Sequence, residues 1–218
     1  YGFGASQGSS IVTFPEGLNP ASVTSWSNTR IECMAPKRVA KGYVTVTTAA
    51  GTSNGFPINF DWTVVLEHDV QTPTNEIQNL GVEFDGSHFW ISGAGSGSNP
   101  NKLYKLDTNG NLVAAYDQPT SSSWGWRDLC WDGTYLYGSD STMIQQINPA
   151  TGTVTGTSIT GPLNPNRALA YDPVTDHFWT GGFGTDIYEI NRSGTVINQY
   201  SNANGIYGMA WDDHTTGG

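Results

Sequence analysis

The sequence has few basic residues and no long apolar run. Of its 218 residues, 9 are lysine or arginine and 19 are aspartate or glutamate, which gives a formal net charge of −10. Nucleic acids and anionic membrane surfaces attract proteins of the opposite charge balance, so we expect neither as a partner. No apolar run approaches the roughly 20 residues that a membrane-spanning helix needs, and the sequence therefore predicts no membrane insertion.

Cysteines and familiar catalytic patterns are also scarce. The two cysteines are Cys33 and Cys130. A disulfide would require their Cα atoms to lie within about 7 Å across two different regions of the chain, so we expect two free, buried thiols. The sequence shows no Ser–His–Asp pattern, no glycine-rich phosphate loop and no cluster with metal-ligand spacing. It therefore predicts no metal and no cofactor, and it favours a non-catalytic function.

What the chain does contain is an internal repeat. Four segments align without gaps: 81–85 (GVEFD), 128–132 (DLCWD), 168–172 (ALAYD) and 208–212 (GMAWD). Their closing aspartates lie 47, 40 and 40 residues apart. In a strand-rich sequence, a period near 40 is typical of the blades of a β-propeller.

Each repeat predicts four strands. In the first repeat, a turn at Asp85 leads into an aromatic second strand at 88–90, followed by an alternating third strand at 103–107. A turn ending in Gly110 and a fourth strand from Leu112 complete the unit. Alternation bounded by turn residues is the pattern of strands and hairpins, and no helical periodicity competes with it. We predict an all-β chain with blades at 81–125, 126–167 and 168–207 and the start of a fourth.

Three blades and a beginning do not close a ring, because known propellers use roughly four to eight blades. We therefore expect the chain to be a piece of a larger protein. Residues 62–70 resemble the fourth strand and exit loop of a blade, which predicts a closure strand that completes the last blade. Open blade edges also predict possible self-association.

The first 60 residues lack the repeat and resemble the immunoglobulin-like IPT/TIG module. The resemblance rests on Tyr1–Gly4, Ile11–Phe14, Ser25–Ile31, Gly42–Thr48 and Gly51–Asn54. It implies a β-sandwich used as a spacer or adhesion module in secreted and surface proteins, which is rarely catalytic. The first strand of that family should precede Tyr1, so the chain looks truncated at this end too.

The repeat half resembles bacterial extracellular propellers of the broad NHL/lyase-like type. We thus predict an immunoglobulin-like sandwich at 1–60 followed by a partial propeller at 61–218. The two resemblances together imply an extracellular or cell-surface location.

The predicted ligand site lies on the loops that enter the innermost strands, where propellers commonly bind ligands. Its candidate residues are Trp124, Trp126, Arg127, Asn166, Arg167 and Tyr207. Arginine presents a planar fork suited to carboxylates, and tryptophan offers a flat face on which sugar rings stack. This combination favours an acidic or neutral saccharide, or a peptide carboxylate. The alternative is structural: the tryptophans cover the top of the blade, and each arginine pairs with a nearby acid such as Asp128.

Two acidic residues depart from the repeat and are the candidate catalytic groups. Glu83 occupies the column of Cys130, Ala170 and Ala210, where a buried carboxylate would be costly unless it is paired. Asp128 stands where the other repeats have glycine or alanine. Two carboxylates near one channel would be a general acid and base pair.

We therefore carry three hypotheses for function. The first is a non-catalytic secreted or surface protein that binds carbohydrate or a surface partner at the mouth of the propeller channel. The second is a propeller-type polysaccharide lyase or hydrolase that uses Glu83 or Asp128. The third is a structural repeat unit of a surface layer or fibre.

Overall fold

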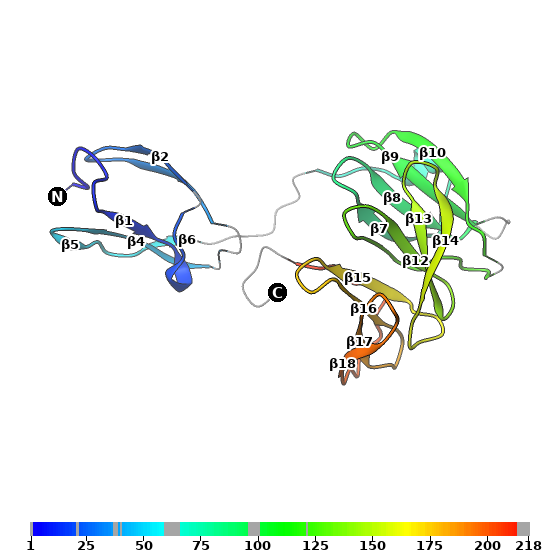
Figure 1. Cartoon of the computed structure of the whole chain (residues 1–218). Coiled ribbons are helices and arrows are strands. Elements are labelled where there is room, and N and C mark those ends of the chain that lie inside the picture. The colour runs from blue at the N-terminus through cyan, green and yellow to red at the C-terminus, as the bar shows by residue number, and fades with distance from the viewer. Residues whose placement is uncertain are drawn as a thin grey trace. The chain divides into compact units, whose positions relative to one another are not determined.

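The chain forms two compact units. The computed structural model describes residues 2–20, 22–36, 39, 41–58, 66–95, 101–120 and 122–212 (Figure 1). The described residues of one unit fall within Tyr1–Val65 and Asp212–Gly218, and the other unit is Leu66–Trp211. Strands dominate both units, which confirms the predicted all-β class.

The first unit is built from two small sheets. Its elements are β1 (Ile11–Thr13), η1 (Pro15–Gly17), β2 (Ser22–Trp26), β3 (Ile31–Met34), β4 (Gly42–Thr48), β5 (Gly51–Thr52) and β6 (Phe56–Ile58). Strand β4 pairs antiparallel with β1, β5 and β6, while β2 pairs with β3 on the other side of the unit (Figure 1). The half-buried Trp26 donates its indole N–H to the Phe3 carbonyl over 3.2 Å. This arrangement has the two layers of a sandwich, and membership of the IPT/TIG family stays a prediction.

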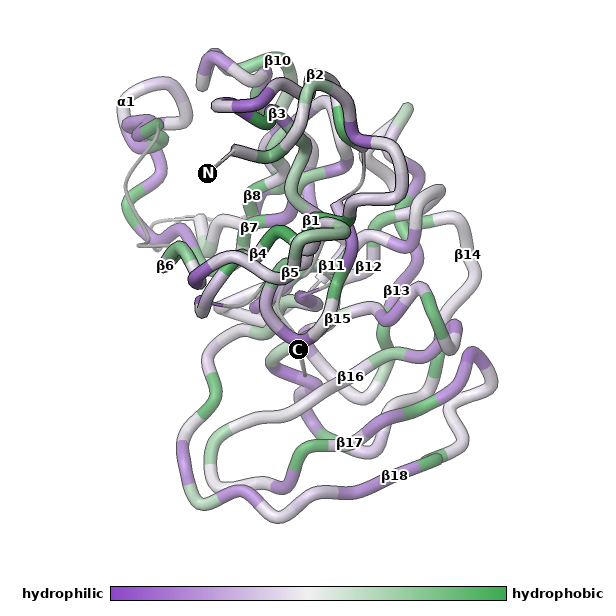
Figure 2. The backbone as a smooth tube through the Cα atoms, turned by 90° about the vertical axis from the view of Figure 1, so that its left-hand side faces the viewer, coloured by the Kyte–Doolittle hydropathy of each residue, from purple (hydrophilic) through white to green (hydrophobic). Residues whose placement is uncertain are grey.

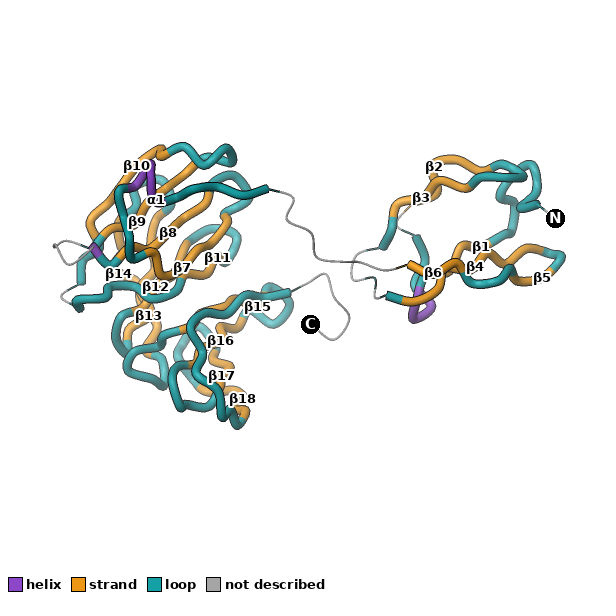
Figure 3. The backbone as a smooth tube through the Cα atoms, turned by 180° about the vertical axis from the view of Figure 1, so that it is seen from behind, coloured by secondary structure: helices purple, strands orange, loops and turns teal. Residues whose placement is uncertain are grey.

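The second unit contains three four-stranded antiparallel sheets (Figure 3). Blade 1 consists of β7 (Asn79–Phe84), β8 (Phe89–Gly93), β9 (Lys102–Leu106) and β10 (Leu112–Asp117). Blade 2 consists of β11 (Leu129–Trp131), β12 (Leu136–Ser139), β13 (Met143–Asn148) and β14 (Thr153–Thr160). Blade 3 consists of β15 (Ala168–Asp172), β16 (His177–Gly181), β17 (Ile187–Ile190) and β18 (Val196–Tyr200). A short helix, α1 (Gln71–Thr74), precedes blade 1.

The apolar cores lie between consecutive blades. The inner strands β7, β11 and β15 are adjacent, because β11 contacts both of the others. Leu129 of β11 packs with Trp90 and Leu103 of blade 1, and Leu169 of β15 packs with Tyr137 of blade 2. Strands such as β17 carry both hydrophobic and hydrophilic residues (Figure 2), and its Ile190 is buried in the core between blades 2 and 3. These interfaces confirm the β-propeller architecture.

The repeated aspartates close the turn between the first and second strands of each blade. One oxygen of Asp85 accepts the backbone N–H groups of Ser87 and His88, over 2.8 and 2.7 Å. Asp132 makes the same pair of bonds with Thr134 and Tyr135. A short acidic side chain that satisfies two backbone donors stabilises a tight turn, which explains the regular aspartate spacing in the sequence.

Blades 2 and 3 are further joined through Arg192 of blade 3. Its guanidinium group donates to both carboxylate oxygens of Asp176, over 2.8 and 3.0 Å. It also reaches blade 2, where it donates to Asp132 over 3.0 Å and to the Tyr137 hydroxyl over 2.9 Å. This arginine is therefore a structural bridge and not part of a ligand site.

The glycine turn before each fourth strand packs against the preceding blade or, in blade 1, against the segment that precedes it. Gly152 and Gly194 have φ angles of 66° and 80°. A Cβ at Gly152 would lie 2.2 Å from the ring of Tyr116 in β10, and a Cβ at Gly194 would lie 2.3 Å from the Thr160 carbonyl oxygen in β14. The equivalent Gly110 faces His68 at 2.7 Å. In blades 2 and 3, the turn glycine faces the fourth strand of the preceding blade. In blade 1, residue 68 occupies the place of that fourth strand.

Two segments that were predicted to form strands do not form strands among the described residues. Residues 62–65 of the predicted closure strand lie outside the described residues, and 66–70 form no strand, so closure stays a prediction. The predicted start of a fourth blade at 208–211 also forms no strand. Its Met209 N–H donates to the Asp128 side chain over 2.9 Å.

Both cysteines are free, as predicted, although Cys33 is half-buried and only Cys130 is fully buried. Burial raises the pKa of the Cys130 thiol well above its usual value, which keeps this group protonated and unreactive. Across the described ranges, no helix combines the length and the apolar character of a membrane span.

Candidate functional site

The structure brings the two predicted arginines to one opening at the N-terminal ends of β11 and β15. Arg167 immediately precedes β15 and Arg127 lies two residues before β11. Each is fixed by a backbone bond to the second strand of the same blade. The Arg127 N–H donates to the Ser139 carbonyl over 3.2 Å, and the Arg167 N–H donates to the Gly181 carbonyl over 3.1 Å. Because the backbone geometry before β11 and β15 is equivalent, both arginines lie at the same end of the inner strands.

A pocket of about 190 Å³ lies at this opening, and we call it the arginine pocket. It is lined by Arg127, Leu163, Asn164, Pro165, Arg167, Gly182, Phe183 and Thr185. The peptide bond between Asn164 and Pro165 is cis. The lining comes from the loop before β15 and from the loop between β16 and β17, so the pocket is made mainly by blade 3 together with Arg127 of blade 2.

Arg167 is oriented by aromatic rings. Its guanidinium carbon lies 3.7 Å from the centroid of the Phe183 ring and 5.6 Å from that of Tyr207. The two rings contact each other edge to face, with centroids 4.5 Å apart. A guanidinium group stacked on an aromatic face keeps its N–H donors free in its own plane. Arg167 is thus held in place without using its hydrogen-bonding capacity on an acid.

Arg127 has an unused donor. Its Nε atom is buried and has no hydrogen-bond partner. Burial lowers the pKa of Arg127, the nearby charge of Arg167 lowers it further, and Asp140 acts in the opposite direction. In the part of the chain that the structure describes, neither Arg127 nor Arg167 forms an ion pair. The pairing of each arginine with an acid such as Asp128, which the structural alternative expects, is therefore not found among the described residues.

Two predicted ligand residues are buried and hold the scaffold instead. Trp126 is 0% exposed, packs in the core between blades 1 and 2, and donates its indole N–H to Gln145 over 2.8 Å. Asn166 is also 0% exposed, and its amide group donates to the carbonyls of Ser141 and Thr142. Both side chains fix the loops before the inner strands, so neither is available to a ligand.

The remaining predicted residues are accessible. Trp124 is 46% exposed and Tyr207 is 75% exposed. Neither residue lines the arginine pocket, but Tyr207 contacts two residues that do, Arg167 and Phe183. The predicted set therefore reduces to Arg127 and Arg167 in the pocket, with Tyr207 beside it and Trp124 as a separate exposed ring.

Sequence analysis missed Phe183, because the search was confined to the loops that enter the inner strands. Phe183 lies in the loop between β16 and β17, within the sequence Gly181–Gly184. The equivalent loop of blade 2 has Asp140 and Ser141 and no aromatic residue. That departure from the repeat was the available signal.

Asp128, a predicted catalytic acid, is a buried structural group. It is 5% exposed, and its Oδ2 atom accepts the backbone N–H groups of Leu169 and Met209, each over 2.9 Å. A Cβ at Gly81 would lie 2.7 Å from the Asp128 Cα, so glycine is needed on the neighbouring strand. Burial raises the pKa of Asp128 to about 7, although the backbone donors act to lower it. The Asp128 side chain therefore links the start of β11 to β15 and to the segment around Met209.

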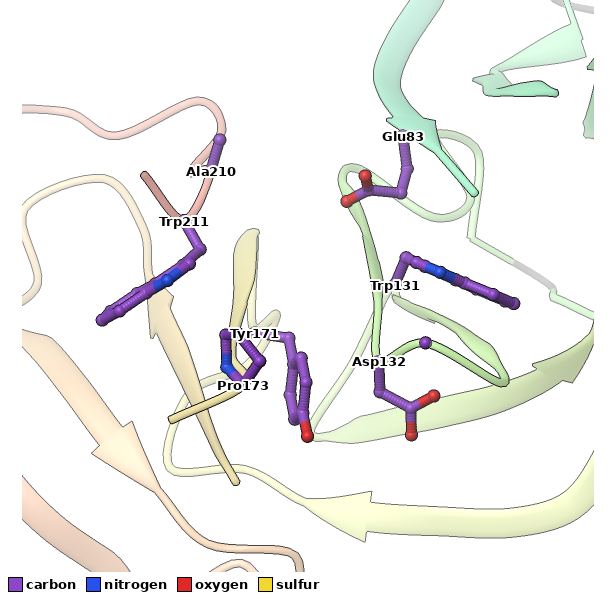
Figure 4. Close-up of a pocket in the computed structure, with 8 residues that line it drawn as sticks. Glu83, Trp131, Asp132, Tyr171, Pro173, Ala210 and Trp211 are labelled. Carbon is purple, nitrogen blue, oxygen red and sulfur yellow. The ribbon is translucent and has the colours of Figure 1, made fainter. Parts of the chain in front are cut away.

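Glu83 lies at the opposite, C-terminal end of the inner strands and faces a cavity of about 330 Å³ (Figure 4). We call this space the glutamate cavity; it is lined by Glu83, Trp131, Asp132, Gly133, Tyr171, Pro173, Ala210 and Trp211. Figure 4 shows the Glu83 carboxylate directed into the space and the Asp132 carboxylate directed away from it. Burial raises the pKa of Glu83, while bonds from the backbone of Phe84 and Trp131 act to lower it.

The predicted acid and base pair does not share a site. Asp128 is not among the residues that line the glutamate cavity, and its exposed fraction leaves no room for a substrate. A substrate in that cavity reaches Glu83 alone. Among the described residues there is also no group of three or more His, Cys, Asp or Glu side chains that would hold a metal ion.

Comparison with known proteins adds little beyond the fold. Two solved structures that match are the crystal structure of RRP9 WD40 repeats and the structure of U3-55K, each with a TM-score of 0.47 and 12% sequence identity. Each match covers 61% of this chain, which spans only 42% of the matched chain. No family model and no curated protein matches the sequence. The assignment of a propeller therefore rests on the three four-stranded sheets and their interfaces.

Proposed function

We propose that this chain is a binding module whose arginine pocket holds the carboxylate of an acidic saccharide. A propeller is a rigid scaffold, which is consistent with a binding role. The single observation that carries the proposal is the pair Arg127 and Arg167, two guanidinium groups at one opening without an acidic partner among the described residues. Like charges held close together in a partly buried site are unfavourable by themselves, and an anionic ligand relieves that repulsion.

The size and surroundings of the pocket fit a carboxylate attached to a sugar ring. A volume of about 190 Å³ accommodates a small acidic group and not a whole oligosaccharide. The remainder of the ligand extends past the exposed ring of Tyr207, which offers a face for stacking. An acidic side chain of a partner protein has the same carboxylate, but it lacks the ring that would use this aromatic face.

An extracellular or cell-surface location is part of this proposal, as is a spacer role for the IPT/TIG-like unit at residues 1–60. The low content of lysine and the acidic charge balance of the chain support the location. No described feature favours catalysis, because Glu83 and Asp128 do not share a site.

The proposal is tested by titrating the full chain with D-glucuronate, D-glucose and an N-acetyl-glutamate amide, by calorimetry at low salt. We expect glucuronate to bind, glucose to bind at least tenfold more weakly, and the double variant Arg127→Gln/Arg167→Gln to lose glucuronate binding. Removing the arginine donors of a charge-assisted contact typically costs a few kcal/mol, roughly a hundredfold in Kd.

The control is Arg30→Gln, which removes one positive charge from a solvent-exposed position in the other unit. It should bind like the wild type. Tighter binding of the glutamate amide than of glucuronate would replace the saccharide by an acidic peptide. Absence of binding by any carboxylate would overturn the proposal.

A further inference from the structure

We propose that the glutamate cavity is a second binding site and that it takes an alkylammonium group. The site lies at the C-terminal ends of the inner strands, opposite the arginine pocket, and it is independent of the function proposed above. Its charged group is Glu83, which departs from a column that is otherwise Cys130, Ala170 and Ala210. Of those three small residues, Ala210 lines the space that Glu83 faces (Figure 4).

Among the described residues, Glu83 has no positive partner and forms no ion pair. Its Oε1 atom accepts the backbone N–H of Phe84 over 2.8 Å, and the Trp131 backbone also interacts with this carboxylate. A half-buried carboxylate without a counter-charge is unfavourable, and a cation placed beside it removes that penalty.

The other side-chain acceptors of the cavity are already engaged within the protein, whereas the indole N–H of Trp211, a donor, is buried without a hydrogen-bond partner. Asp132 accepts hydrogen bonds from two backbone N–H groups, from Tyr137 and from Arg192. The Tyr171 hydroxyl donates to Asp176 over 2.8 Å. Glu83 is therefore the acceptor that remains for a ligand.

The neighbouring residues select the type of cation. Pro173, Ala210 and parts of Tyr171 and Trp211 line the remainder of the cavity, so an alkyl chain finds apolar contacts next to the carboxylate. A metal ion needs several oxygen ligands, and only one carboxylate points inward. A sugar needs donors and acceptors on several sides. A guanidinium group prefers two free acceptors in one plane, whereas Oε1 is already bonded. A single charge on an apolar stem fits best.

The experiment is a titration of the ¹⁵N-labelled full chain, followed by NMR of the Phe84 backbone amide and the Trp211 indole. The probes are n-butylammonium, 1-butanol as the neutral analogue, and acetyl-Gly-Lys-Gly-amide. We expect saturable shifts with butylammonium, with a Kd of the order of 1 mM, and at least tenfold weaker binding of butanol. Tighter binding of the lysine peptide than of the free amine identifies a protein side chain as the source, and the reverse order identifies a small amine.

Two variants test the cavity, and a third controls for charge. Glu83→Gln keeps an acceptor for Phe84 but lacks the charge, and we expect it to weaken butylammonium binding at least tenfold. Ala210→Leu retains Glu83 and fills the space from an exposed position, and it should block binding without affecting the fold. Glu67→Gln removes the same charge from an exposed residue outside the cavity and should bind like the wild type. Equal binding of butanol and butylammonium, unchanged binding by Glu83→Gln, or no saturable shift would overturn the proposal.

Discussion

At the scale of single residues, this propeller places ionisable groups where its repeat otherwise has small ones. Asp128 is the clearest case, because its column elsewhere contains only glycine or alanine. Its carboxylate satisfies the N–H groups of Leu169 and Met209 inside the protein. The same position buries a potential negative charge, and burial raises the pKa of this aspartate to about 7. Asp128 therefore connects neighbouring segments of the propeller, but it makes the free energy of unfolding depend on pH.

The direction of that dependence follows from proton linkage. The folded protein retains the Asp128 proton up to about pH 7, whereas the unfolded chain releases it near the ordinary value of 3.8. The free energy of unfolding therefore falls as pH rises between these values, by roughly 4 kcal/mol at most. Asp128→Asn keeps an oxygen for both backbone donors and has no charge to bury. We expect the variant to resemble the wild type near pH 4 and to be more stable at pH 8.

Urea unfolding of both proteins at pH 4.5 and pH 8 measures this effect. Taking the difference between variant and wild type at each pH cancels the contribution of the other titrating groups. If that difference is the same at both pH values, Asp128 does not titrate in this range and its burial has no electrostatic cost.

At the scale of elements, the turn before each fourth strand connects one blade to the next. The glycine of this turn needs a positive φ, and it also lies against the preceding blade without room for a Cβ. Both requirements act at Gly194, which faces the Thr160 backbone. Strain from φ alone acts at Gly156, where φ is 91° and a Cβ would meet no atom within 4 Å.

These two glycines allow the steric contact to be separated from backbone strain. We expect Gly156→Ala to lower the stability of the propeller unit by about 1 kcal/mol, the usual cost of a strained φ, and Gly194→Ala to lower it by about 2–4 kcal/mol. The midpoints of urea unfolding, monitored by tryptophan fluorescence, provide the comparison. Equal losses in the two variants would mean that the turn does not press on β14.

Elements of this kind are what sequence analysis predicts well. The aspartate turns recur because bonds within a few residues satisfy them, and the glycine turns recur because they need a positive φ. Both requirements can be recognised in the local sequence. The arginine pocket was only half predicted. Arg127 and Arg167 occupy equivalent columns and were identified, whereas Phe183 belongs to another loop and meets Arg167 only after the sheet has formed. Burial decided against Trp126 and Asn166, whose partners lie 19 and 25 residues away along the chain.

At the scale of the whole molecule, one face of blade 1 remains uncovered. Leu80, Val82 and Phe84 of β7 are 36%, 62% and 42% exposed. The residues equivalent to Val82 are Leu129 and Leu169, which are 1% and 0% exposed because each packs against the preceding blade. The face of β7 therefore has the shape and the apolar character of a blade interface, and burying it is favourable by about 25 cal/mol per Å².

This uncovered face supports the predicted self-association through blade edges. We expect the full chain to form dimers as its concentration rises into the micromolar range, and Val82→Asp to shift that equilibrium towards the monomer by at least tenfold, because it places a charge in the contact. Sedimentation velocity over a range of concentrations measures both. Val174→Asp is the matched control, since Val174 is 73% exposed in a turn of blade 3. A wild type that stays monomeric at every concentration, or an equal effect of the two aspartates, would show that a second copy does not cover this face.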